Sequence, residues 1–225
     1  MQISSETKTL RKVLVLGGTG LVGTCLVQLA SIHPAVSEVI APVRKVPEDA
    51  SARHQSNVHW LAVDFDKLED QAALFEVDVV LCALGTTMRK AGSRQAFEAV
   101  DLELPLRAAR RARSASVSRF GAVSSTGANP KSSVFYSRTK GRLEAGLALL
   151  NFEILVLARP SLLLGDRPEK RFGEDSAKAF LEPINWMVPS AWRPIQASKV
   201  ARQLLDATLE AGPGVHVLDN AALLS

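Results

Sequence analysis

The 225-residue chain has few of the residues that mark disulfide-rich, metal-binding or membrane proteins. Its two cysteines, Cys25 and Cys82, lie far apart and form no C-x-x-C pair or ligand cluster, so we expect buried, reduced thiols and no metal site. It has no run of about 18 uninterrupted apolar residues, and we expect no membrane span. The amino terminus lacks the apolar core of a signal peptide, which predicts a cytoplasmic protein.

Aromatic residues and excess charge are also scarce. The formal net charge is only +4, and the densest basic stretch, the arginines of residues 107–113, is typical of a solvated helix face. We therefore expect no nucleic-acid partner. The chain contains a single tyrosine, Tyr136, so no second tyrosine can share its role.

Short apolar runs alternate with longer helical patterns, which predicts an α/β fold: one Rossmann-type doubly wound parallel sheet over residues 1–225. The predicted strands are residues 13–17, 38–43, 58–63, 77–83, 119–124, 153–157 and 214–218. The predicted helices start near residues 20 and 68 and cover residues 93–112, 135–149 and 198–210. Residues 165–195, with four prolines and two tryptophans, break the alternation. They predict an irregular lid or substrate segment, or else a plain surface excursion.

The most informative segment is residues 13–23, Val-Leu-Val-Leu-Gly-Gly-Thr-Gly-Leu-Val-Gly. Gly18, Gly20 and Gly23 fit G-x-G-x-x-G, and Gly17 begins a looser form of the same pattern. Such glycines permit a tight turn, let backbone N–H groups approach a pyrophosphate and let the helix pack on the strand. Because a strand pattern precedes the turn and a helical pattern follows it, the segment predicts a dinucleotide site.

Other candidate cofactor residues follow later strands. Arg44 stands after the second strand, where a carboxylate would usually bind the ribose 2′-OH; with Lys45 it suits a 2′-phosphate, unless the two form a merely solvated pair. Asp64 either accepts a hydrogen bond from the adenine amino group or caps the next helix. Leu84 and Gly85 begin a small-residue turn that lets the backbone approach the cofactor.

Tyr136 and Lys140 form Y-x-x-x-K in a predicted helix, which places the phenol and the ammonium one turn apart on one face. A nearby cation favours the phenolate, so such a pair can exchange a proton with an alcohol or carbonyl. Ser124, Ser125 and Thr126 end the fifth strand, and any one of them can hydrogen-bond the substrate oxygen. We take Ser125 as the candidate.

Together these motifs resemble the atypical short-chain dehydrogenases/reductases, and more narrowly the Tat-interacting-protein type of NADPH-binding oxidoreductase. That type's Leu-Gly-Thr-Thr and Lys-Ala-Gly stand here at residues 84–87 and 90–92. The resemblance implies that Tyr136 is the proton donor and acceptor. It further implies that Lys140 holds the nicotinamide ribose and favours the phenolate. It also implies cofactor contacts from Thr19, Gly20, Leu21, Val22, Arg44, Lys45, Leu84, Gly85, Leu163 and Arg171.

Two departures from the wider superfamily limit the resemblance. No Asn-Asn-Ala-Gly follows the fourth predicted strand. Val100-Asp101 stands where the wider superfamily commonly has an Asn-Val pair, so a proton relay through that asparagine cannot be carried over. The sequence predicts an NADP(H)-dependent oxidoreductase acting on a small carbonyl or alcohol. The alternative is a non-catalytic NADPH-binding regulator or assembly factor. The helices at 93–112 and 135–149 can also pair across a two-fold axis, which would give a homodimer.

Overall fold

The apolar runs predicted as strands pair into one parallel sheet in the computed structural model, which describes residues 10–48, 55–165 and 189–225. The strand order is β3-β2-β1-β4-β5-β6-β9, so the direction of chain winding reverses between β1 and β4. This order confirms the predicted Rossmann-type fold. The strands are β1 (Arg11–Leu16), β2 (Val36–Val43), β3 (Val58–Ala62), β4 (Val79–Cys82), β5 (Arg119–Val123), β6 (Ile154–Ala158) and β9 (Gly214–Leu218).

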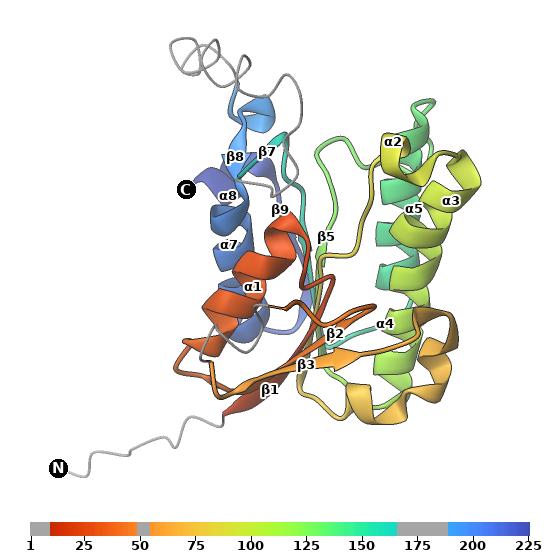
Figure 1. Ribbon diagram of the computed structural model, residues 1–225. Helices are drawn as coiled ribbons and strands as arrows, with labels where there is room; N and C mark the ends of the chain where they lie inside the picture. The colour runs from red at the N-terminus through yellow and green to blue at the C-terminus, as the bar shows by residue number, and fades with distance from the viewer. Residues whose placement is uncertain (1–9, 49–54, 166–188) are drawn as a thin grey trace, which may run out of the picture.

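Helices cover both faces of the sheet (Figure 1). One layer contains α1 (Leu21–Ser31), α7 (Ala197–Glu210) and α8 (Asn220–Leu224). The other contains α4 (Leu104–Ser114) and α5 (Phe135–Ala148). Alternate residues of β1 point into the two cores: Val13 and Val15 pack with α1 and α7, whereas Leu14 and Leu16 pack with α4 and α5. A strand buried on both faces must be apolar throughout, which explains the uninterrupted run in the sequence.

Smaller elements lie at the end of the sheet where the strands finish. They are α2 (Met88–Ala91), α3 (Arg94–Glu98), a two-stranded parallel sheet of β7 (Leu163–Leu164) and β8 (Ile195–Gln196), and a 3₁₀ turn, η6 (Ser190–Trp192). Most of the predicted lid segment, residues 166–188, falls outside the described residues. In the described parts of the chain, no helix combines the length and apolarity needed to cross a membrane.

The structure corrects two predicted helices. The helix expected from residue 68 is replaced by two 3₁₀ stretches, η2 (Phe65–Asp70) and η3 (Ala72–Phe75), because Lys67 and Gln71 leave helical geometry and Asp64 bonds the backbone of the first turn. The helix expected over residues 93–112 contains a π turn, η4 (Ala99–Glu103). Pro105 explains the widening, since its ring has no N–H for the carbonyl four residues earlier and would crowd it.

Gly121, in the middle of β5, sets how closely α7 approaches the sheet. A Cβ at this position would overlap Thr208 Oγ1 and lie 2.9 Å from Leu81 Cδ2. We expect Gly121→Ala to destabilise the fold by about 1–3 kcal/mol through overpacking. Urea unfolding measures the change, and Gly212→Ala is the control, because nothing lies within 4 Å of its added Cβ. Equal stability of the two variants would contradict this account of the packing.

Candidate active site

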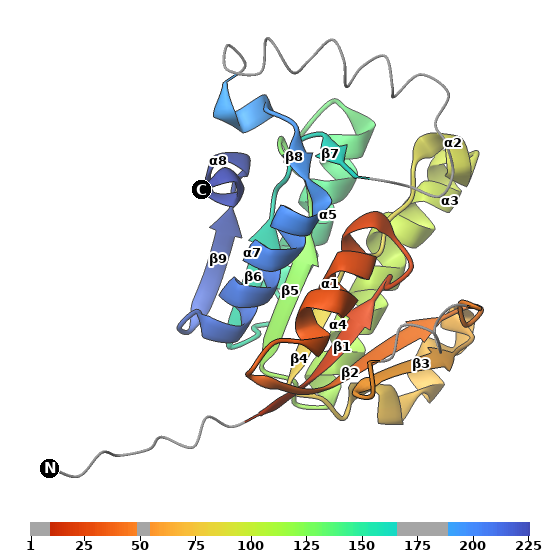
Figure 2. The same ribbon diagram turned by 60° about the vertical axis from the view of Figure 1, so that its left-hand side comes forward.

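The strands of the parallel sheet all end at one edge (Figure 2), and the predicted site residues that directly follow them lie at that edge. Gly17 follows β1, Arg44 follows β2, Asp64 comes shortly after β3, and Leu84 comes shortly after β4. The Ser124–Thr126 segment follows β5 at the same edge. Residues separated by more than one hundred positions in the sequence thus surround the point where the winding reverses.

The glycine turn is tight and leaves its outer side open. Gly17 has φ +83°, a left-handed conformation, and a Cβ there would lie 2.7 Å from the carbonyl oxygen of Ala83. A Cβ on Gly23 would overlap the carbonyl oxygen of Gly17, so helix α1 is packed directly on the turn. Thr19 and Gly20 are exposed, and Gly20, the N-cap residue of α1, has no side chain with which to cap the helix. Such an uncapped helix start presents backbone N–H groups to an anion.

A cavity of about 470 Å³ lies beyond the ends of β2 and β3. It is lined by Arg44, Ala62, Val63, Asp64, Phe65 and Asp66. Arg44 is exposed, while Asp64 accepts a hydrogen bond of 3.0 Å from the backbone N–H of Asp66. Asp64 therefore caps the following 3₁₀ turn, one of the two roles predicted for it. Lys45 is also exposed and lies 3.9 Å from Glu48, nitrogen to oxygen.

Tyr136 and Lys140 occupy the first turns of α5, as their spacing predicts, but their surroundings differ. Tyr136 is 40% exposed and its ring centroid lies 5.8 Å from that of Phe97. Lys140 is only 4% exposed, and its Nζ lies 2.8 Å from Oδ1 of Asp101, which is itself buried. The backbone N–H of Thr86 donates to the other oxygen of Asp101 at 2.7 Å. The ammonium is thus held by a carboxylate that the turn after β4 also holds.

Lys140 keeps its positive charge although its side chain is buried. Desolvation is the largest single influence and would lower its pKa, but the attraction of Asp101, the attraction of Tyr136 and the hydrogen bond to Asp101 together raise that pKa above the usual value. Lys140 is therefore a cation at neutral pH, one helical turn from the phenol.

The three hydroxyl side chains after β5 have different partners. Ser124 Oγ donates to Glu144 Oε1 at 2.5 Å, and Thr126 Oγ1 donates to the carbonyl of Arg159 at 3.0 Å. Ser125 Oγ is buried and has no hydrogen-bond partner among the described residues. The sequence leaves the choice among these three open. Of the three, only the Ser125 hydroxyl makes no hydrogen bond within the part of the chain that the structure describes.

Residues 13–142 match the model of the NAD dependent epimerase/dehydratase family. The chain belongs to this family. It is 34% identical over 220 residues to Protein HTATIP2 of Rattus norvegicus, covering 95% of this chain and 88% of the relative. It is 32% identical over 205 residues to Protein FMP52, mitochondrial, of Candida albicans, covering 85% of each. The resemblance drawn from the motifs is thereby confirmed.

Solved structures show the same fold. The Bordetella bronchiseptica enzyme WbmG, crystallised in complex with NAD, superposes with a TM-score of 0.68 at 15% sequence identity. The match covers 96% of this chain and 74% of that one. At this identity the likeness concerns the fold alone.

Among the remaining candidates, this member of the epimerase/dehydratase family places Gly85 next to Asp101: a Cβ on Gly85 would lie 3.2 Å from Asp101 Oδ1. Leu84 is half-buried and packs against the core on the α4 and α5 side of the sheet. Leu163 lies in β7 and is half-buried. Arg171 falls outside the described residues.

Sequence reasoning assigns no role to two acids of the site, Asp101 and Glu144. Glu144 accepts bonds from Ser124 and from Arg159 Nε at 2.9 Å, which ties α5 to the ends of β5 and β6. For Asp101 a signal exists in the sequence. It stands on a stripe of otherwise apolar helical positions, all buried in the structure: Phe97, Asp101, Pro105, Ala108 and Ala112. An acid on a buried stripe requires a partner.

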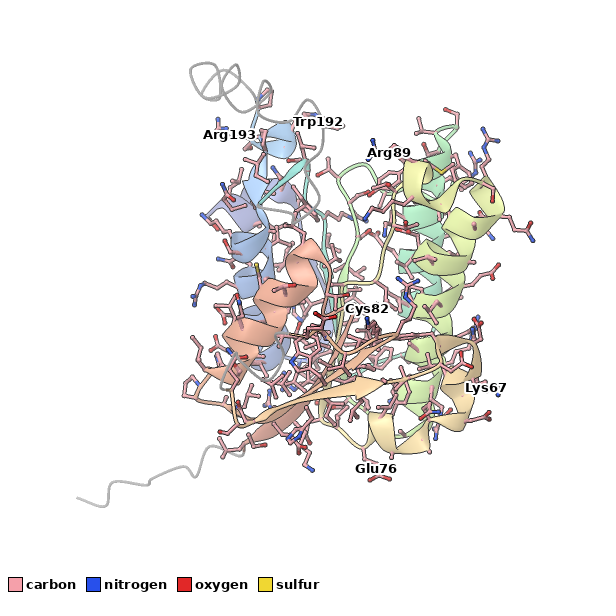
Figure 3. All side chains as sticks on the ribbon, viewed as in Figure 1. Lys67, Glu76, Cys82, Arg89, Trp192 and Arg193 are labelled. Atoms are coloured by element: carbon pink, nitrogen blue, oxygen red, sulfur yellow. The ribbon has the colours of Figure 1, made fainter. Side chains whose placement is uncertain are left out.

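Cys82 lies in the central strand β4, between the two helical layers (Figure 3). Burial raises the pKa of its thiol to about 11. Cys25 is half-buried rather than buried as predicted, because it lies beside the buried stripe of α1; partial burial still raises its pKa. Both cysteines are free thiols.

We expect Cys82 not to act as a nucleophile. In Cys25→Ala, where Cys82 is the remaining thiol, a thiol-specific reagent at pH 7.5 should react slowly with the folded protein and fully after denaturation, because the thiolate is the reactive form. The same assay on Cys82→Ala reports Cys25. Rapid modification of folded Cys25→Ala would contradict the assignment.

Proposed function

We propose that this protein is an NADPH-dependent oxidoreductase that transfers hydride between NADP(H) and a small carbonyl or alcohol, with Tyr136 as the acid and base. The observation that carries the proposal is the buried Ser125 hydroxyl, which has no hydrogen-bond partner among the described residues. An unsatisfied buried polar group requires an explanation, and a substrate oxygen supplies one. The backbone N–H of Asn129 bonds the carbonyl of Ser137 at 3.0 Å, which joins the Ser125 loop to the start of α5 beside Tyr136.

The open edge of the sheet fits a dinucleotide. The uncapped start of α1, from Gly20 to Gly23, suits the pyrophosphate. Arg44 and Lys45 suit a 2′-phosphate, and the adjoining cavity suits the adenosine. Lys140 suits the nicotinamide ribose. The NAD held by WbmG, a protein of the same fold, supports a dinucleotide at this edge.

When bound, NADPH supplies the hydride. The chain's own residues then handle the proton. Tyr136 Oη gives its proton to the carbonyl oxygen as that oxygen becomes an alcohol, and the resulting phenolate is favoured by the Lys140 cation. Ser125 Oγ donates a hydrogen bond to the same oxygen, which orients the carbonyl toward the phenol. In alcohol oxidation the proton returns to the phenolate.

The preference for NADPH depends on Arg44. We expect wild type to bind NADPH more tightly than NADH, and Arg44→Ala to lose about 1.5–3 kcal/mol, roughly tenfold or more in Kd for NADPH, with little change for NADH. Fluorescence titration measures both constants. Arg110→Ala removes an exposed arginine of α4 and is the control. Equal affinity of wild type for the two cofactors would overturn the NADP assignment.

The role of Tyr136 distinguishes an enzyme from a regulator. Tyr136→Phe deletes only the hydroxyl, so it should bind NADPH almost normally and lose turnover by ~10²–10⁴-fold. NADPH oxidation is followed against a panel of aldehydes, ketones and quinones. Ser137→Ala, which removes the neighbouring hydroxyl, should retain activity. A wild type that binds NADPH tightly and turns over no member of the panel would favour the non-catalytic regulator instead.

A further inference from the structure

We infer that Asp101 is a positioning residue for the proposed reaction: its carboxylate fixes the Lys140 ammonium and offsets its charge, and thereby sets how readily the Tyr136 phenol releases its proton. The inference rests on the proposed function, because it assigns a partner to the proposed acid and base. The effect of Asp101 on Tyr136 can be measured on the protein alone, without substrate or cofactor.

The geometry holds the Asp101 carboxylate in one orientation. Oδ1 faces Lys140 Nζ at 2.8 Å, and Oδ2 accepts the Thr86 N–H at 2.7 Å. The side chains of Asp101 and Lys140 are only 2% and 5% exposed, so water does not screen the pair. Gly85 leaves room for the carboxylate, since a Cβ there would approach Oδ1 to 3.2 Å. The turn after β4, the π turn η4 and helix α5 are thus linked through one side chain.

The backbone accounts for the position of this acid. Asp101 lies in the π turn, four residues before Pro105, which offers its carbonyl no N–H. Glu98, one turn earlier, is half-buried and pairs with Arg142 of α5 at 2.6 Å. Of these two neighbouring acids, only Asp101 is directed at the buried ammonium.

Other charged groups around Lys140 do not replace Asp101. The Cys82 thiol of β4 is neutral at pH 7, because burial raises its pKa to about 11. Glu144, one turn along α5, already pairs with Arg159 at 2.5 Å. Asp101 is therefore the close counter-ion of Lys140 within the described chain.

Two arginines lie over the ring of Phe135, the residue before Tyr136 in α5. Arg94 of α3 lies 5.2 Å from the ring centroid of Phe135, and Arg138 of α5 lies 5.9 Å from it. Both arginines are unchanged in the variants at Asp101 and Lys140, so their effect on Tyr136 is the same in wild type and in each variant.

The sign of the effect follows from charge. Lys140 alone favours the phenolate, whereas the adjacent carboxylate opposes it. Replacing Asp101 by asparagine keeps the shape and an acceptor for the Thr86 N–H, but removes the carboxylate that helps to keep Lys140 charged against desolvation. The Tyr136 phenolate, which also attracts Lys140, is then the anion that balances the buried ammonium. The phenol should then ionise at lower pH. Replacing Lys140 by methionine should have the opposite effect.

The single tyrosine makes a direct test possible, because absorbance at about 295 nm on raising the pH reports phenolate formation, and here only Tyr136 can form it. In Asp101→Asn we expect the pH of half-ionisation to fall by roughly one unit relative to wild type. In Lys140→Met we expect it to rise, and in the double variant to return close to wild type. Glu98→Gln removes one acid of the same segment and should leave the titration unchanged. Circular dichroism over the same pH range verifies that each variant stays folded.

An unchanged or raised half-ionisation pH in folded Asp101→Asn would overturn the inference. If that variant does not fold, the double variant decides, since it buries no unpaired charge. If the double variant ionises at the same pH as wild type, the Asp101 and Lys140 charges offset each other at Tyr136, as we infer. If it ionises at the higher pH of Lys140→Met, the inference is contradicted. The titration measures no turnover, so it is independent of the activity assay. A wild type without enzymatic activity would contradict the proposed function, but it would leave the effect of Asp101 on Tyr136 ionisation unchanged.

Discussion

The structure depends on burying the central strands of a parallel sheet on both faces. A parallel strand can be followed by another only through a crossover, and the crossovers here place helical layers on the two sides. All strands therefore end at one edge, and each loop that leaves this edge contributes to the same region. The chemistry of the site is a consequence of this constraint, since Gly17, Arg44, Asp101 and Ser125 come from four different segments of the chain.

Within that region the residues divide between an open part and a buried part. The open part, from the uncapped start of α1 to the cavity beside Arg44, offers backbone N–H groups and exposed cations. The buried part contains ion pairs that fix α5: Lys140 with Asp101, and Glu144 with Arg159. Buried charges are costly unless paired, so these pairs hold α5 in a defined position relative to β4, β5 and β6. A rigid α5 places Tyr136, which is itself half exposed, at the border between the two parts.

Membership of the epimerase/dehydratase family agrees with this arrangement. Family membership indicates the reaction less specifically than the side chains of the site do. The same fold supports different reactions, so the reaction has to be argued from side chains. Two features of this chain bear on the proposed proton transfer more directly than the fold does. The Ser125 hydroxyl has no hydrogen-bond partner within the described chain, and the Lys140 cation pairs with Asp101.

The sequence by itself determined the sheet, the glycine turn and the Tyr136–Lys140 spacing, because each depends on a local pattern: apolar runs, the steric freedom of glycine, and helical periodicity. It did not determine the 3₁₀ stretches at residues 65–75, where Asp64 competes for the backbone, nor the half-exposure of Cys25. Only the tertiary structure decided which hydroxyl after β5 is left unengaged and which carboxylate meets Lys140. Both outcomes depend on contacts between residues 15 to 39 positions apart, and no local pattern encodes the distance between two such side chains.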